Sequence, residues 1–181
     1  MVDQLEIVKQ VTKRLDQAGI AYMVSGSMAM NFYAQPRMTR DIDIVIALEL
    51  EDVDRLVAIF ALDFYVDDEI VRTAVATPGL FNIIHNESVV KIDFIVRKNS
   101  DYRRKEFQRR RRVVFHGADI WWVSAEDLVL SKLVWSKDSH SEMQLRDIRN
   151  LIDSVENLDW VYIDYWAQAL AVQSLLSEVK P

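Results

Sequence analysis

The most constraining feature of the sequence is residues 41–48, where acidic and apolar residues alternate before the segment becomes largely apolar. Alternation with a period of two is typical of a β-strand, so Asp41 and Asp43 are expected to leave the same face of that strand. The isoleucines between and after them share the opposite face. Two neighbouring carboxylates repel each other, and burying either is costly without compensation. A divalent cation between the two carboxylates would remove this conflict.

A third acid has the properties needed to join this pair. Asp93 lies in residues 89–96, a segment that is otherwise strongly strand-like. If this strand neighbours the strand of Asp41 and Asp43, three carboxylates converge. Mg²⁺ prefers hard oxygen ligands, namely a few carboxylates completed by water and substrate phosphate. Such a cluster can hold two Mg²⁺ ions that clamp the attacking and leaving oxygens of a phosphoryl or nucleotidyl transfer.

A turn earlier in the chain adds a candidate phosphate-binding element. Ser25-Gly26-Ser27 joins a short apolar run at residues 20–24 to a helical pattern at residues 28–34. The free N–H groups of a helix start and the helix dipole both favour a phosphate at this position, and glycine permits close approach of the backbone. Taken singly, the acid pair, the turn and Asp93 are ordinary features of solvated turns or paired charges. Their combination indicates a nucleotide–metal site.

The remaining pattern predicts an α/β (α+β) fold, with a mixed sheet domain over residues 1–123 and a helical portion over residues 124–181 packed on it. Helices are expected at residues 5–18, 28–34, 51–62, 124–135, 142–154 and 159–178. Strands are expected at residues 20–24, 41–48, 81–85, 89–96, 111–115 and 119–123, the last four as two hairpins. Ser124, with Asp127 three residues later, is expected to cap the first C-terminal helix.

Composition excludes several classes of protein. The absence of cysteine rules out disulfides, zinc–thiolate sites and thiol catalysis. No apolar run reaches the roughly 18 residues of a membrane span, and the acidic N-terminus has no secretory signal, so a cytoplasmic protein is expected. The net charge of −6 argues against general affinity for nucleic acid.

The combined motifs resemble the nucleotidyltransferase superfamily related to DNA polymerase β. Its signature is G-S, a helix, an acid–apolar–acid–apolar strand and a third acid on a later strand, matched here by Gly26-Ser27, Asp41-Ile42-Asp43-Ile44 and Asp93. The stretch from Arg37 to Asp43 resembles the R-x-T-x-D-I-D form of the AbiEii-like branch, whose members include toxins of bacterial toxin–antitoxin systems. Residues 126–133, followed by Arg146-Asp147-Ile148, are similar to that branch's helical lysine motif and its R-D pair.

The resemblance implies an enzyme that transfers a nucleoside monophosphate from an NTP to an acceptor hydroxyl and releases pyrophosphate. Asp41 and Asp43 would bind two Mg²⁺ ions, and Asp93 would complete the metal site and help to deprotonate the acceptor. The nucleotide, for example ATP, would be held by five further residues: Gly26, Ser27, Arg37, Thr39 and Lys132. For Lys132 the alternative is a solvated lysine, and Arg146 and Asp147 would either support it or form surface ion pairs.

The acceptor stays open between RNA, a protein side chain and a small hydroxylated molecule. The arginine-rich residues 103–112 could guide RNA, or could instead be a solvated basic face or a seam paired with acidic helices. Two other readings also stay open: a non-catalytic module that binds NTP or a toxin–antitoxin partner, and a purely structural acidic cluster.

Overall fold

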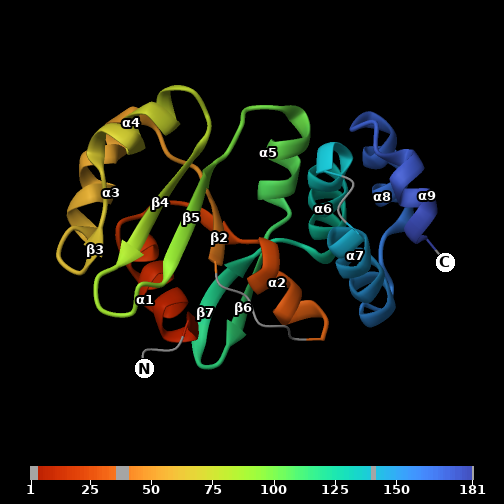
Figure 1. Ribbon diagram of the computed structural model, residues 1–181, viewed down its shortest axis with the longest axis horizontal. Helices are drawn as coiled ribbons and strands as arrows, with labels where there is room; N and C mark the ends of the chain where they lie inside the picture. The colour runs from red at the N-terminus through yellow and green to blue at the C-terminus, as the bar shows by residue number, and fades with distance from the viewer. Residues whose placement is uncertain (1–3, 36–40, 140–141, 181) are drawn as a thin grey trace.

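The structure is a computed structural model that describes residues 4–35, 41–139 and 142–180. Its described strands form one mixed sheet in the order β3-β4-β5-β2-β1-β7-β6 (Figure 1). The strands are β1 (Tyr22–Val24), β2 (Asp41–Ile46), β3 (Phe64–Tyr65), β4 (Leu80–His85), β5 (Lys91–Val96), β6 (Arg111–Phe115) and β7 (Ala118–Trp122).

Helices surround this sheet. α3 and α4 lie at one end of the molecule, and α6 to α9 gather at the other end with the C-terminus (Figure 1). The helices are α1 (Gln4–Gln17), α2 (Gly26–Tyr33), a 3₁₀ turn (Leu50–Asp52), α3 (Val53–Phe60), α4 (Asp68–Ala76), α5 (Asp101–Gln108), α6 (Ala125–Ser139), α7 (Glu142–Ser154), α8 (Trp160–Ala169) and α9 (Gln173–Val179). The expected α/β class is confirmed. No helix within the described ranges has the length and apolarity to cross a membrane.

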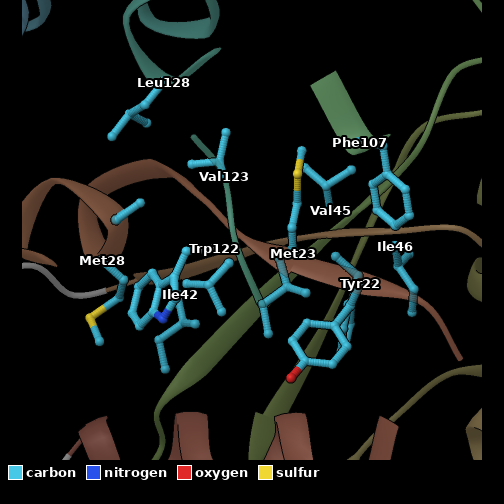
Figure 2. Packing of buried hydrophobic residues seen from close by; sticks show 14 of the residues in the cluster. Tyr22, Met23, Met28, Ile42, Val45, Ile46, Phe107, Trp122, Val123 and Leu128 are labelled. Carbon is cyan, nitrogen blue, oxygen red and sulfur yellow. The ribbon is translucent and has the colours of Figure 1, made fainter. Parts of the chain in front are cut away.

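The centre of the sheet is built on β2. This strand pairs parallel with β5 and antiparallel with β1, while β1 pairs parallel with β7. On one face, Ile42, Ile44 and Ile46 are fully buried, as the alternation predicts. Figure 2 shows part of this core, where β1, β2 and β7 residues such as Tyr22 and Trp122 pack closely. The opposite face of β2 is left to carry the acids.

The capped start of α6 was correctly anticipated. The Asp127 backbone N–H donates to the Ser124 hydroxyl at 3.2 Å, and that hydroxyl donates to the Asp127 carboxylate at 2.6 Å. Both expected hairpins are also present, as β4–β5 and β6–β7. The division of the chain into a sheet domain (residues 1–123) and a helical portion (residues 124–181) stays a prediction.

The prediction of one helix over residues 159–178 is wrong. The chain forms two helices, α8 and α9, because Ala171 adopts a left-handed conformation with φ +55° that breaks the helix. The break lets the neighbouring Val172 side chain become fully buried. A helical pattern cannot reveal such a break when no glycine or proline marks it.

Candidate active site

The structure brings two of the three acids directly together. β2 and β5 run parallel with Asp43 opposite Asp93 and Asp41 opposite Lys91. Directly opposite residues on neighbouring strands lie within about 5 Å and project from the same face of the sheet. The expected adjacency of the two acid-bearing strands is therefore confirmed.

The Gly26 turn packs against Asp43. Gly26 has a left-handed φ of +56°, and a Cβ added to it would lie 1.9 Å from the Asp43 Oδ2 atom. The Ser25 N–H also donates to the Asp43 backbone carbonyl at 2.9 Å, which ties β1 to β2 at this level. Any side chain at Gly26 would be strained and would overlap the carboxylate. Glycine is thus required to bring the first turn of α2 onto the acid.

The surroundings of Asp43 disfavour the charged form of its carboxyl group. Burial raises the pKa of its carboxyl above the usual range, and the neighbouring charges of Asp93 and Asp41 raise the pKa further. A hydrogen bond from the Ser27 backbone and the charge of Lys132 act in the opposite direction but do not outweigh burial. The described surroundings of Asp43 therefore favour its neutral, protonated form.

Among the described residues, Lys91 forms an ion pair with each of the other two acids. Its ammonium lies 2.9 Å from the Asp93 Oδ2 atom and 3.6 Å from the Asp41 Oδ1 atom. Asp93 is only 8% exposed, and its Oδ1 atom is buried without a hydrogen-bond partner among the described residues. The described chain contains no set of three or more His, Asp or Glu side chains already arranged to hold a metal. The ammonium of Lys91 would have to move before a cation could bind both Asp41 and Asp93.

Lys132 is not a solvated lysine. It is 2% exposed, and its ammonium donates to the Asp147 Oδ2 atom at 2.9 Å and to the Gln144 Oε1 atom at 3.0 Å. Asp147 is likewise buried, whereas Arg146 is exposed. Of the pair Arg146-Asp147, only Asp147 is shown to contact Lys132 in the described chain. This ion pair joins α7 to α6 and holds the Lys132 ammonium in place. Contact of Lys132 with a triphosphate stays a prediction.

Two expected nucleotide-binding residues, Arg37 and Thr39, lie outside the described residues. Lys91 was not singled out from the sequence, although its position two residues before Asp93 places both side chains on one face of β5. That spacing was a usable signal.

The arginine-rich segment is largely engaged with acids. It forms α5 and the start of β6, and ion pairs join Arg103 to Glu106, Arg109 to Asp127 and Arg112 to Asp119. The geometry favours a seam paired with acidic residues. Contact with RNA stays a prediction.

Comparison with known proteins identifies the group to which this arrangement belongs. Residues 4–167 match the family described as "Nucleotidyl transferase of unknown function (DUF2204)". No curated protein matches the chain.

Three solved structures have a similar fold. The solution structure of the antibiotic-resistance factor ANT(2'')-Ia has a TM-score of 0.66 at 12% identity, over 97% of this chain and 95% of the other. The lincomycin-bound lincosamide antibiotic adenylyltransferase LnuA has a TM-score of 0.58 at 14% identity, over 85% and 99%. An antigenic nucleotidyltransferase-like protein from Paracoccidioides brasiliensis has a TM-score of 0.55 at 20% identity, over 96% and 90%. At these identities the similarity shows the fold, and the match over residues 4–167 shows that the chain belongs to the nucleotidyl transferase family of unknown function.

Proposed function

We propose that this protein transfers a nucleoside monophosphate from a Mg²⁺-bound NTP to an acceptor hydroxyl and releases pyrophosphate. The observation that carries the proposal is the register of β2 and β5, which sets Asp43 opposite Asp93 on the face that also bears Asp41. The Gly26 turn packed on Asp43 adds the backbone of a helix start to the same place. Acids and a phosphate-binding turn in one place are what nucleotidyl transfer needs.

The residues present fit magnesium. The buried Asp93 Oδ1 atom has no hydrogen-bond partner in the described chain, and the pKa of Asp43 is raised by burial and by neighbouring acids. An oxygen-binding divalent cation would relieve both costs. Asp41, Asp43 and Asp93 would hold the metal, in the proposed case as two ions. When bound, Mg²⁺ would supply positive charge to the reacting phosphate oxygens.

The remaining groups have roles that follow from their positions. The N–H groups at the start of α2 would bind the β- and γ-phosphates, because the helix start that Gly26 brings beside Asp43 favours an anion. The ammonium of Lys132, held by Asp147, would add a fixed positive charge near Asp43. Asp93 would accept the proton of the acceptor hydroxyl as the new bond to the α-phosphorus forms and the bond to pyrophosphate breaks.

A labelling experiment tests the proposal. The purified protein is incubated with Mg²⁺, each α-labelled NTP in turn, and separate pools of RNA, cell protein and small hydroxylated metabolites. The wild type and Asp153→Asn, which changes an exposed acid on α7, are expected to label one pool, and Asp43→Asn is not. Labelling that survives Asp43→Asn, or no labelling of any pool, would overturn the proposal.

ATP and a small-molecule acceptor are the first combination to try, since two of the structurally similar proteins are described as an antibiotic adenylyltransferase and an antibiotic-resistance factor. The motif resemblance to the AbiEii-like branch adds a toxin–antitoxin role to the proposal. Expression in a bacterial host tests this role. Growth arrest by the wild type but not by Asp43→Asn supports it, and growth unaffected by the wild type counts against it.

A further inference from the structure

A cavity of about 150 Å³ adjoins the proposed active site. It lies between the sheet and the helices α5 and α6, and its floor includes Val45 and Ile95. These residues follow Asp43 and Asp93 by two positions, so they lie on the same face about 7 Å further along their strands. Ser25, next to Gly26, lines the cavity as well. The cavity therefore lies on the same face of the sheet as Asp43 and Asp93, one step further along the same two strands.

The charged lining of the cavity is mostly cationic. Arg97, Lys98 and Arg103 contribute to it, against the single carboxylate of Glu106. Arg103 is already committed, because it donates to both Glu106 oxygens at 2.8 and 2.9 Å, and Ser131 donates to the same carboxylate at 2.5 Å. The carboxylate of Glu106 is thus paired with Arg103, another residue of the lining.

Arg97 and Lys98 are not neutralised in this way. Neither forms an ion pair with an acid anywhere in the described chain. The Arg97 Nε atom is buried and lacks a hydrogen-bond partner among the described residues, while its guanidinium lies 5.3 Å from the Phe107 ring on α5. The cavity is therefore lined by two cationic side chains that no acid of the described chain neutralises, which is the charge that an anion site needs.

We propose that this cavity binds an acidic group, a phosphate or a carboxylate, of the acceptor; the assignment to the acceptor rests on the proposed function. The NTP phosphates are assigned to Gly26 and Ser27 beside Asp43, whereas Arg97 directly follows the end of β5, four positions or about 13 Å of extended chain beyond Asp93. This separation leaves the cationic end for the second substrate. A cavity of about 150 Å³ accommodates a group the size of benzene, which suits one phosphate or carboxylate. A polycationic acceptor would be repelled.

Titration of inorganic phosphate tests the inference. Phosphate is added to protein saturated with Mg²⁺ and α,β-methylene-ATP, and heat is recorded by calorimetry. Arg97→Gln and Lys98→Gln are each expected to weaken phosphate binding about tenfold, because each removes a charge-assisted contact. Lys105→Gln removes an exposed charge from α5 outside the cavity, and this variant is expected to change the phosphate affinity less than about twofold. Lys98 is exposed, so its variant remains informative if Arg97→Gln unfolds.

The outcomes separate this inference from the proposed function. Absence of phosphate binding, or equal loss in Lys105→Gln, overturns the cavity assignment. Loss of analogue affinity in parallel with phosphate affinity overturns it too, since the anion would then belong to the nucleotide. If the wild type binds none of the α,β-methylene analogues of the four NTPs, the proposed function fails instead. Phosphate is then titrated without nucleotide, and the cavity is an anion site only if Arg97→Gln and Lys98→Gln each weaken that binding about tenfold while Lys105→Gln does not.

Discussion

Two groups of acids in this molecule differ in how the protein balances their charge. The paired cluster consists of Glu106, Glu126 and Asp127, on α5 and α6. Asp127 is completely buried, yet its carboxylate accepts hydrogen bonds from Tyr162 at 2.7 Å, Ser124 at 2.6 Å and Arg109 at 3.1 Å. Every acid of this cluster has an arginine partner. This is how a protein stabilises buried charge for structural purposes.

The open cluster consists of Asp41, Asp43 and Asp93. One lysine, Lys91, pairs with both Asp41 and Asp93, and the buried Asp93 Oδ1 atom has no hydrogen-bond partner in the described chain. Around Asp43, burial and the charges of Asp93 and Asp41 outweigh the hydrogen bond from the Ser27 backbone and the charge of Lys132. The same fold that neutralises Asp127 leaves Asp43 with a raised pKa and the Asp93 Oδ1 atom without a described partner, which is the expected signature of a site that completes its charge with a ligand.

The largest effect is expected from breaking the paired cluster. Asp127→Ala leaves Arg109 and Tyr162 without their buried partner, so we expect a loss of about 3–5 kcal/mol in the free energy of unfolding. Urea unfolding followed by circular dichroism measures it. Asp119→Ala breaks the exposed pair with Arg112 and is the matched control, with an expected loss below about 1 kcal/mol. Equal losses in the two variants would refute the distinction.

Substitution of Asp93 in the open cluster should lower activity and leave stability nearly unchanged. Asp93→Asn keeps the shape of the side chain but removes a charge that the proposed chemistry uses. We expect nucleotidyl transfer to fall at least about 100-fold, or about 2.7 kcal/mol in the activation free energy, measured with α-labelled NTP. Its melting temperature should stay close to that of the wild type. A drop in melting temperature that accounts for the lost activity would place Asp93 with the structural acids.

A smaller effect is expected at Lys91, whose ammonium contacts the acids that would hold the metal. Lys91→Met removes this internal cation while keeping an unbranched side chain. We expect Mg²⁺ to bind about three- to tenfold more tightly, because the ion no longer displaces an ammonium or meets its charge. Calorimetry with Mg²⁺ alone measures the affinity. Weaker binding in this variant would mean that Lys91 supports the metal site.

The smallest effect concerns pH and the metal-free protein. The folded-state pKa of Asp43 is raised by burial first and by Asp93 and Asp41 next, so the folded state holds this proton more tightly than the unfolded state does. Stability contributed by Asp43 is therefore present at acidic pH and is lost as the pH rises through the folded-state pKa.

Asp43→Asn removes this dependence. In excess chelator it should be more stable than the wild type at neutral pH, by about 1 kcal/mol as for other substitutions that relieve a functional site. The difference should shrink toward pH 4. A wild type that is the more stable of the two at neutral pH, without metal, would show that the open cluster is compensated after all.

The sequence predicted the open cluster better than its surroundings. The alternation around Asp41 and Asp43 predicts a strand from the local sequence alone. Once β2 pairs with β5, Asp93 lies opposite Asp43. The paired cluster depends on contacts between α5, α6 and α8 that no local pattern encodes. α5 itself was not recognised, because its many charged residues were interpreted only as a basic segment.

Two other elements were missed for related reasons. α4 begins at the Asp67 cap, whose side chain accepts from the Ile70 N–H at 3.1 Å, a local signal that was available in the sequence. β3 has two residues and exists only through its pairing with β4, which a sequence pattern does not reveal. The cavity beside Ile95 was equally invisible, because it depends on how α5 and α6 sit on the sheet.

The central claim is that the open cluster is completed by a metal ion. Titration of Mn²⁺, detected by electron paramagnetic resonance as a stand-in for Mg²⁺, tests this claim most directly in the wild type, Asp93→Asn and Asp153→Asn. The account predicts saturable binding to the wild type and to Asp153→Asn, competition by Mg²⁺, and loss of binding in Asp93→Asn. Binding that is absent from the wild type, or unchanged in Asp93→Asn, would contradict it.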